Sequence, residues 1–249
     1  MTEKIAGVNS IMEALKGQRK VHKIFIQEGR QGNKIEELVT YARKKGVFVQ
    51  YLEKSRLDAM YTASNHQGVV AQISAFDYSE IGEVLEKACL EKHEPFILIL
   101  DGIEDPQNFG SIIRTAEAAG VHGIVIPKHN STEVTAAVAR ASAGAVEHIL
   151  IIRETNLVNT INFLKQQGFW IIGADMQGEK EYFNTVIPAP TALVIGGEGR
   201  GIRRLVRENC DLLLNIPMTG KIGSLNASVS AALLIYEVVR QRNTRPGNK

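Results

Sequence analysis

From residue 95 to residue 242, short apolar runs alternate with segments of helical periodicity, and this alternation limits the possible folds more than any other feature. Short apolar runs separated by helices are typical of strands buried on both faces of a parallel sheet. Strands are expected at residues 96–100, 123–126, 149–152, 169–174, 192–195 and 212–216, and helices at residues 110–119, 134–141, 157–167, 202–208 and 227–241. The predicted fold class is therefore α/β, with a mainly parallel sheet covered by helices on both faces.

A smaller α/β pattern occupies the first 75 residues, with helices expected at 9–15 and 34–45 and strands at 21–27, 47–52 and 68–73. The stretch that follows it is polar and helix-forming, and we interpret it as a linker. The predicted organisation is an N-terminal domain at 1–75, a linker at 76–94, a larger domain at 95–242 and a disordered tail at 243–249.

The net charge of +2 says little about partners, but the charge is unevenly distributed. Residues 1–75 hold 12 Lys and Arg against 7 Asp and Glu, a balance of +5, whereas the remainder holds 17 against 20, a balance of −3. A basic N-terminal segment favours the capture of phosphates, although Lys and Arg that only solubilise helices would give the same count.

Several classes of protein are disfavoured by composition. No apolar run is long enough to span a bilayer, and the N-terminus lacks the apolar core of a signal peptide. Cys89 and Cys210 are too few for a disulfide framework or a zinc site, so we expect a cytoplasmic protein. The six histidines show no metal-ligand spacing, so no metal is expected, and His122, His129 and His148 are interpreted as structural.

Three polar segments each follow an expected strand and precede an expected helix. They are DGIEDPQNFGSIIRTAEAAG at 101–120, ALVIGGEGRGI at 192–202 and IPMTGKIGSLNASVSAALLIYE at 216–237. Such junctions have unpaired backbone N–H groups and small side chains that let a ligand approach.

Each segment also has an ordinary explanation when it is taken alone. Asn108 and Asn226 could cap helices, and Arg114 could pair with Glu117 on one helix face. The glycine-rich segment could be a tight turn. It matches neither a dinucleotide fingerprint nor a P-loop, which argues against a nucleotide-dependent oxidoreductase.

In this order the three segments resemble the motifs of the SpoU (TrmH) family of RNA ribose 2′-O-methyltransferases, within the SPOUT superfamily. The resemblance covers about residues 95–242, and residues 1–74 resemble the substrate-binding domain of some members. It implies S-adenosylmethionine as methyl donor and a C-terminal trefoil knot, which periodicity alone does not indicate. It also implies a homodimer, which we expect to be built on the C-terminal domain because the last helix is rich in small and apolar residues: Ala227, Ala231, Ala232, Leu233 and Ile235.

Within this family the chain resembles the bacterial enzymes that methylate a guanosine ribose in 23S rRNA, and the resemblance implies such a guanosine as the substrate. One alternative is a tRNA ribose methyltransferase, although members that act on the tRNA D-loop usually lack such an N-terminal domain. Another is an RNA-binding protein that has lost catalysis. The family's polar motif residues are all present here, which argues against such a loss.

The resemblance also implies the site residues. On the acceptor side it places Asn108, Arg114, Glu198, Ser224 and Asn226, and at the donor site Gly196, Gly197, Ile216, Met218, Leu225 and Ser228, with residues 216–224 closing over the donor. Because a guanidinium stays protonated, we expect Arg114 to stabilise charge on the 2′-oxygen or to hold the adjacent phosphate. Glu198, Ser224, a phosphate or water could then accept the proton.

Overall fold

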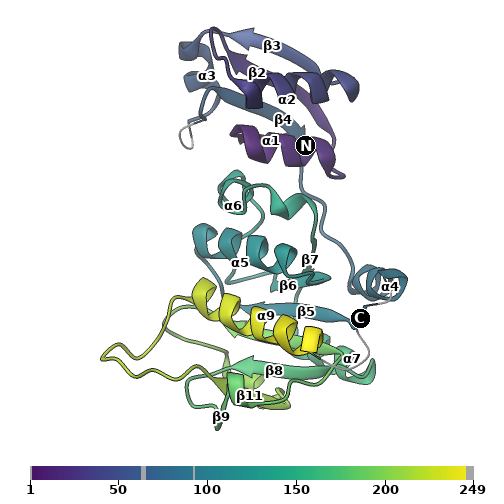
Figure 1. The fold of residues 1–249 in the computed structure, drawn as a ribbon, viewed down its shortest axis with the longest axis vertical. Helices are drawn as coiled ribbons and strands as arrows, with labels where there is room; N and C mark the ends of the chain where they lie inside the picture. The colour runs from purple at the N-terminus through teal and green to yellow at the C-terminus, as the bar shows by residue number, and fades with distance from the viewer. Residues whose placement is uncertain (1, 63–65, 92, 245–249) are drawn as a thin grey trace. The chain divides into compact units, whose positions relative to one another are not determined.

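The computed structural model describes residues 2–62, 66–91 and 93–244, and it divides the chain into two compact units (Figure 1). The N-terminal unit comprises Met1–Asp77 and Glu133–His148, and the C-terminal unit comprises Tyr78–Thr132 and Ile149–Lys249. The sequence analysis places the helix expected at residues 134–141 in the larger domain, residues 95–242. Instead, helix α6 (Ala136–Ala141) lies in the N-terminal unit, where Ala136 packs against its core and the Ser10 hydroxyl donates to the Ala139 carbonyl.

The N-terminal unit is built on a four-stranded sheet in the order β1-β4-β2-β3. These strands are β1 (Thr2–Ala6), β2 (Val21–Gln27), β3 (Phe48–Leu52) and β4 (Val69–Ser74), and the helices are α1 (Val8–Lys16), α2 (Asn33–Lys44) and α3 (Lys54–Met60). Strands β2 and β3 are parallel, whereas β4 runs antiparallel to β1 and β2. The sequence analysis missed β1 and α3 because only the last two residues of β1 and only Leu57 of α3 are buried, which leaves no periodicity.

The C-terminal unit contains a seven-stranded sheet in the order β7-β6-β5-β10-β8-β11-β9. The strands are β5 (Phe96–Asp101), β6 (Gly123–Pro127), β7 (Leu150–Glu154), β8 (Trp170–Ala174), β9 (Lys180–Glu181), β10 (Thr191–Gly196) and β11 (Leu212–Asn215). All its strand pairs are parallel, so the predicted parallel sheet is confirmed. Only the two-residue β9 was not expected.

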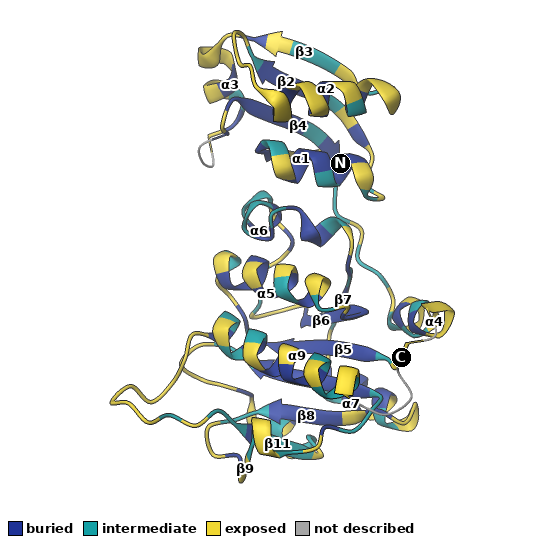
Figure 2. Ribbon diagram, in the orientation of Figure 1, coloured by how far each residue is buried: buried dark blue, intermediate teal, exposed yellow. Residues whose placement is uncertain are grey.

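Helices cover both faces of this sheet, as predicted (Figure 1). On one face α4 (Ile81–Glu91), α7 (Leu157–Gln166) and α8 (Arg204–Glu208) bury apolar side chains in one core with β5, β6 and β10. On the other face α5 (Pro106–Ala118) packs against α9 (Ala227–Thr244), which also contacts β10. The central strands β6, β5 and β10 are buried and the outer helix faces are exposed (Figure 2). The trefoil knot stays a prediction.

The largest differences from the expected helices concern α4, α5 and α9. Residues 81–91 of the expected linker form α4, whose Val84 is buried in the C-terminal core. Helix α5 begins earlier than predicted because Asp105 caps it, accepting from the Asn108 N–H at 3.0 Å, and Pro106 occupies its first position. Helix α9 continues to Thr244, so the first two residues of the expected tail are helical, and residues 245–249 lie outside the described residues. Among the described residues, no helix is both long and apolar enough to cross a membrane.

Candidate functional site

The three polar segments leave the sheet at one edge. Strands β5, β10 and β11 run parallel and end at Asp101, Gly196 and Asn215, so their carboxyl ends share an edge. From β5 the chain continues to β6 on one side, and from β10 it continues to β11 on the other. The gap between β5 and β10 is therefore a topological switch point, where open parallel sheets form their ligand crevices.

The glycine-rich segment folds back on itself at this edge. The Gly197 N–H donates to the Asp101 carbonyl at 2.9 Å, and the Gly201 N–H donates to the Gly197 carbonyl at 3.0 Å. A Cβ atom on Gly196 would lie 2.1 Å from the Gly201 carbonyl carbon, and one on Gly197 would lie 2.0 Å from the Gly102 oxygen. The close approach of one backbone to another therefore already requires these glycines, before any ligand is considered.

A buried carboxylate that the sequence analysis did not identify anchors the same segment. Asp101 accepts from the backbone N–H of Arg203 at 2.8 Å and from its Nε at 2.6 Å. The carboxylate is fully buried, whereas the Arg203 side chain is half exposed. This pair joins the chain after the glycines to the end of β5. One of several arginines beyond a glycine-rich stretch gives little sign of such a role in sequence.

Side chains from all three segments meet in one hydrogen-bonded network. Asn108 and Asn226 both donate through Nδ2 to Oε1 of Glu198, and Asn226 Nδ2 also donates to Asn108 Oδ1 at 2.9 Å. Because a carboxylate only accepts, it orients both amides. No described residue donates to the second carboxylate oxygen of Glu198, and this side chain is exposed.

The helix-cap interpretation is confirmed for one of the two asparagines. Asn226 Oδ1 accepts from the backbone N–H of Ser228 at 2.9 Å and from its hydroxyl at 2.6 Å, so Asn226 caps α9 as well as joining the network. The side chain of Asn108 caps nothing, because Asp105 takes that role, and it points to Glu198 instead.

The remaining predicted site residues, all of which the structure describes, make no hydrogen bond to the network of Asn108, Glu198 and Asn226, apart from Ser228. Arg114 is exposed, and its guanidinium makes no hydrogen bond or ion pair with any described residue, so the pairing with Glu117 does not form. Ser224 and Leu225 are exposed, whereas Ile216 and Met218 are half-buried. Within the described part of the chain, no backbone group of residues 216–225 makes a hydrogen bond. This segment therefore presents a run of open donors and acceptors.

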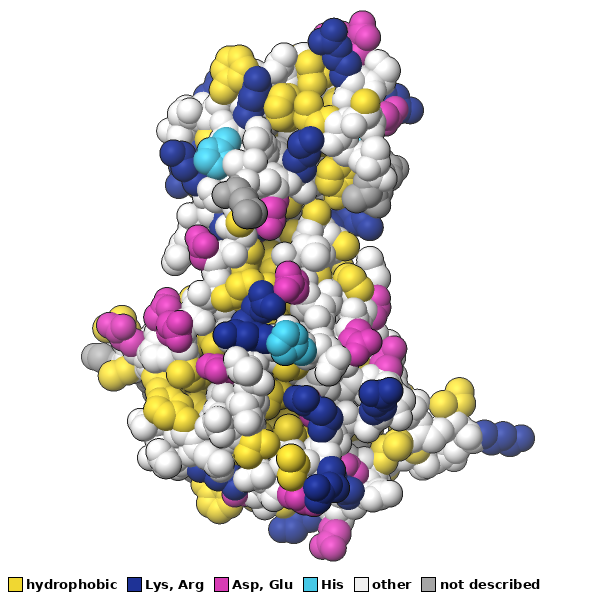
Figure 3. All heavy atoms as spheres, turned by 180° about the vertical axis from the view of Figure 1, so that it is seen from behind, with side chains coloured by type: hydrophobic (Ala, Val, Ile, Leu, Met, Phe, Trp, Pro, Cys, Tyr) yellow, Lys and Arg dark blue, Asp and Glu magenta, His cyan; other side chains and the backbone are white. Residues whose placement is uncertain are grey.

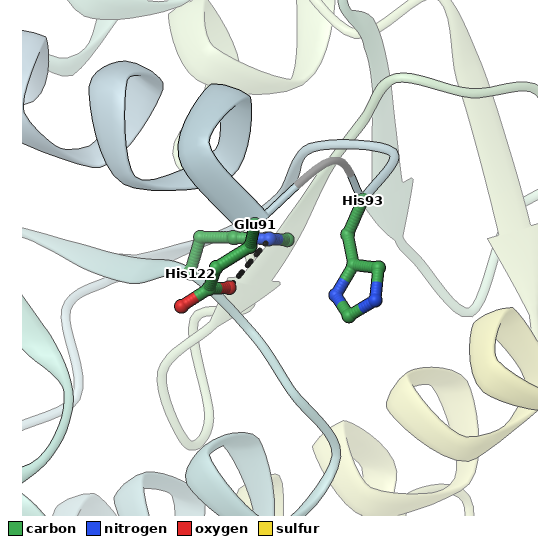
Figure 4. A group of neighbouring side chains, drawn as sticks. All are labelled: Glu91, His93 and His122. Atoms are coloured by element: carbon green, nitrogen blue, oxygen red, sulfur yellow. Dashed lines mark ion pairs between the residues drawn. The ribbon is translucent and has the colours of Figure 1, made fainter.

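Possible metal ligands do gather elsewhere, contrary to the expectation from histidine spacing. Glu91, His93 and His122 bring one ligand atom each within 4.8 Å of the others, because His122 precedes β6 beside the start of β5 (Figure 4). However, His122 Nδ1 accepts from the Phe96 N–H, which leaves the proton of the neutral ring on Nε2. That proton faces Glu91, whose Oε2 lies 3.5 Å from Nε2. A protonated nitrogen does not ligate a cation, so the cluster does not fit a metal site.

Comparison with known proteins agrees with this architecture. The model of the SpoU rRNA Methylase family matches residues 95–236, and that of RNA 2′-O ribose methyltransferase substrate binding matches residues 4–79. A Bacillus subtilis protein assigned by name to the TrmH family of tRNA/rRNA methyltransferases, YacO, is 48% identical over 96% of both chains. A Staphylococcus aureus relative with a name of the same kind is 44% identical over 96% of both chains.

Solved structures share the fold. The SpoU methyltransferase AviRb from Streptomyces viridochromogenes superposes with a TM-score of 0.81 at 24% identity, covering 98% of this chain and 90% of its own. An AdoMet-bound rRNA methyltransferase from Sinorhizobium meliloti has a TM-score of 0.77 at 24% identity, covering 98% and 88%. The A. aeolicus TrmH/SpoU tRNA modifying enzyme has a TM-score of 0.55 at 27% identity and covers 67% and 90%.

More than half of the chain matches the methylase model, and relatives above 40% identity match it almost end to end. The chain therefore belongs to the SpoU rRNA methylase family.

Proposed function

We propose that this protein transfers the methyl group of S-adenosylmethionine to a ribose 2′-hydroxyl of RNA, and that the acceptor is a guanosine in 23S rRNA. The observation that carries the proposal is the network of Asn108, Glu198 and Asn226, which joins the three motif segments at the carboxyl edge of the parallel sheet. Family membership supports RNA methylation, and AdoMet is named in solved structures of this fold.

The segment after β11 fits the proposed donor. The open backbone groups of residues 216–225 offer alternating donors and acceptors of the kind that recognise an adenosine, and they carry no charge that would repel a cationic sulfonium. Ile216, Met218 and Leu225 supply apolar surface, and Gly196, Gly197 and Ser228 lie at the ends of the neighbouring elements. When bound, S-adenosylmethionine supplies an electrophilic methyl group.

The acceptor hydroxyl must lose its proton as its oxygen attacks. The two amides that hold Oε1 of Glu198 orient this carboxylate and leave its second oxygen open, so we propose Glu198 as the proton acceptor. The Arg114 guanidinium stays protonated and is not engaged by any described residue, so it can stabilise charge on the 2′-oxygen or hold the adjacent phosphate. Ser224, in the exposed segment, is proposed to contact the ribose.

The domain organisation supports ribosomal over transfer RNA. The A. aeolicus tRNA modifying enzyme covers 67% of this chain, whereas the Sinorhizobium meliloti rRNA methyltransferase covers 98%. The chain also matches a model of RNA 2′-O ribose methyltransferase substrate binding over residues 4–79. Cys89 and Cys210 are both free thiols, which supports the proposed cytoplasmic location.

Mass-spectrometric mapping of ribose methylation tests the proposal. RNA from cells with and without the protein should differ at one guanosine of 23S rRNA, with transfer RNA unchanged. A difference confined to transfer RNA would identify the alternative substrate. In parallel, calorimetry should detect donor binding, and donor at about 100 times its dissociation constant should stabilise the fold by about 2.7 kcal/mol. No difference in any RNA, together with no donor binding in the presence of RNA, would contradict the proposal.

A further inference from the structure

Two cavities on the N-terminal unit share a lining. One has a volume of about 740 Å³ and opens at the carboxyl ends of β2 and β3, where Gln27 and Lys54 line it. The other has a volume of about 440 Å³ and is lined by the first turns of α1 and α2 and by Arg140 of α6. Arg30 and Gln67 line both cavities, and the two adjoining cavities are together named here the sheet-end groove.

The groove is lined by cations that are not neutralised. Its basic side chains are Arg30, Lys34, Lys54 and Arg140, and none of them makes a hydrogen bond or an ion pair with a described residue. Its acidic lining residue, Asp58, is engaged by His66, whose Nε2 lies 2.8 Å from Asp58 Oδ1. The groove therefore keeps a positive potential that can attract an anion.

Overall charge does not single out this place. On the face drawn in Figure 3, Lys and Arg side chains are scattered over the N-terminal unit rather than gathered in one patch. The groove is defined instead by its concave shape together with cations that no described residue pairs.

The backbone of the groove adds to its cationic side chains. Neither α1 nor α2 has a side-chain cap at its N-terminus, where Gly7 and Gly32 stand, and first-turn residues of both helices line the 440 Å³ cavity.

We propose that the sheet-end groove binds the phosphate backbone of the substrate RNA at an unpaired segment, with Arg30, Lys34, Lys54 and Arg140 contacting phosphates. The inference rests on the proposed function, which makes RNA the substrate. The match of residues 4–79 to a substrate-binding model supports RNA over a small free anion. The larger cavity falls within the size range of ligand pockets and admits a nucleotide whose base is not paired.

Arg140 extends this site beyond the region that the family comparison marks as substrate-binding. It lies outside residues 4–79 and inside residues 95–236, which match the methylase model. The structure brings it to the groove because Glu133–His148 belongs to the N-terminal unit. The stretch of sequence that forms the parallel sheet thus also contributes one cation to RNA capture.

The test is binding of a short fluorescent oligouridine to the full-length protein at several salt concentrations. The variant R30Q/K34Q/K54Q/R140Q should bind more weakly, and the slope of log K against log salt should fall by about 0.7 for each lost phosphate contact with single-stranded RNA. R43Q/K44Q, which removes two exposed cations near the end of α2, is the matched control and should keep the slope. R140Q alone should lower both affinity and slope. All four groove residues are exposed or half-exposed, so thermal unfolding should not change.

Three outcomes would contradict the proposal that the groove binds RNA. One is a quadruple variant that matches the wild type in affinity and slope, and another is an R43Q/K44Q variant that loses as much as the quadruple variant. The third is a groove that binds inorganic phosphate while the quadruple variant keeps its RNA affinity, which would identify a small-anion site. Donor calorimetry separates failure of the groove proposal from failure of the proposed function. If the wild type binds donor, binds RNA and methylates it, the proposed function holds and only the assignment of the groove is wrong.

Discussion

At the scale of single residues, the proposed chemistry depends on how Asn226 and Glu198 are held. Asn226 caps α9 through its carbonyl oxygen and reaches Glu198 and Asn108 through its amide nitrogen, so one side chain fixes both a helix and a carboxylate. The cap and the catalytic interpretation, which the sequence presents as alternatives, are therefore compatible. Arg114 has no such support, and its role depends on the RNA that it meets.

Substitution of Arg114 should separate its possible roles. If the guanidinium stabilises charge on the 2′-oxygen, Arg114→Ala should lower single-turnover methylation about 10²–10³-fold, with folding and donor affinity unchanged. Arg114→Lys should restore only part of the rate, because an ammonium lacks the planar two-point contact. Near-normal rates in both variants would show a solvated side chain without a catalytic role. Loss of donor affinity would move Arg114 to the donor side.

His122 should make stability depend on pH. Burial, the largest cause, lowers the pKa of its imidazole below the ordinary value of 6.5, and Lys87 and Arg242 lower it further, whereas the Phe96 backbone and Glu91 oppose the shift. Above about pH 6.5 both the folded and unfolded states are neutral at this position. Below it the unfolded state binds the proton more readily, so stability is lost as the pH falls, by at most about 1.4 kcal/mol per pH unit.

Denaturant unfolding of the wild type and His122→Gln between about pH 7.5 and pH 5 measures this contribution. The variant should show a shallower loss of stability at low pH, because it removes the buried titrating group. His129→Gln, at an exposed position, is the control and should retain the wild-type slope. Equal slopes for all three proteins would exclude His122 as the cause.

At the scale of elements, periodicity in the sequence predicted the buried strands of the large sheet. It did not reveal the features that depend on contacts between distant parts of the chain. The buried strands of the large sheet produce apolar runs, so six of its seven strands and its parallel arrangement were predictable. Helix α4 was interpreted as a linker because few of its residues are buried. The pairing of Asp101 with Arg203 links positions that are far apart in sequence, and no local pattern reveals it.

The glycine-rich segment provides a prediction at this scale. Gly197→Ala should destabilise the fold by about 1–3 kcal/mol, because the new Cβ would meet the Gly102 carbonyl oxygen at 2.0 Å and displace the end of β5. Gly220→Ala is the control, since a Cβ there meets nothing within 4 Å, and its stability should change by less than about 0.5 kcal/mol. Unchanged stability of Gly197→Ala with lost donor binding would assign this glycine to the ligand instead of to chain packing.

At the scale of the whole molecule, the compact units do not follow the order of the chain. A truncated protein lacking residues 1–77 would keep Glu133–His148 without the core that Ala136 packs against and without Arg19, the ion-pair partner of Glu147. Such a truncation therefore tests RNA capture poorly, and substitutions in the groove are the cleaner experiment. No pattern in the sequence indicates that Glu133–His148 belongs to the N-terminal unit, because the periodicity of α6 is that of an ordinary helix in either unit.

The whole molecule should also be a homodimer. Of the residues that motivated this prediction, Ala227, Ala231 and Ile235 are buried within their own unit, whereas Leu233 is exposed. Val229, Leu233 and Tyr236 are 47%, 36% and 50% exposed. Their spacings of four and three residues place them on one helix face, and an exposed apolar face of this kind is suited to a self-complementary interface.

Sedimentation at micromolar concentration should therefore give about twice the 27.4 kDa mass of one chain. Leu233→Glu should shift the mass towards that of the monomer, because it places a charge within the apolar face and leaves the intramolecular core intact. Phe163→Glu, at another exposed apolar residue on α7, is the control and should leave the dimer unchanged. If both protomers contribute to each site, the Leu233→Glu monomer should also lose methylation. A wild-type mass near that of one chain would contradict the dimer, and a fully active Leu233→Glu monomer would contradict a shared site.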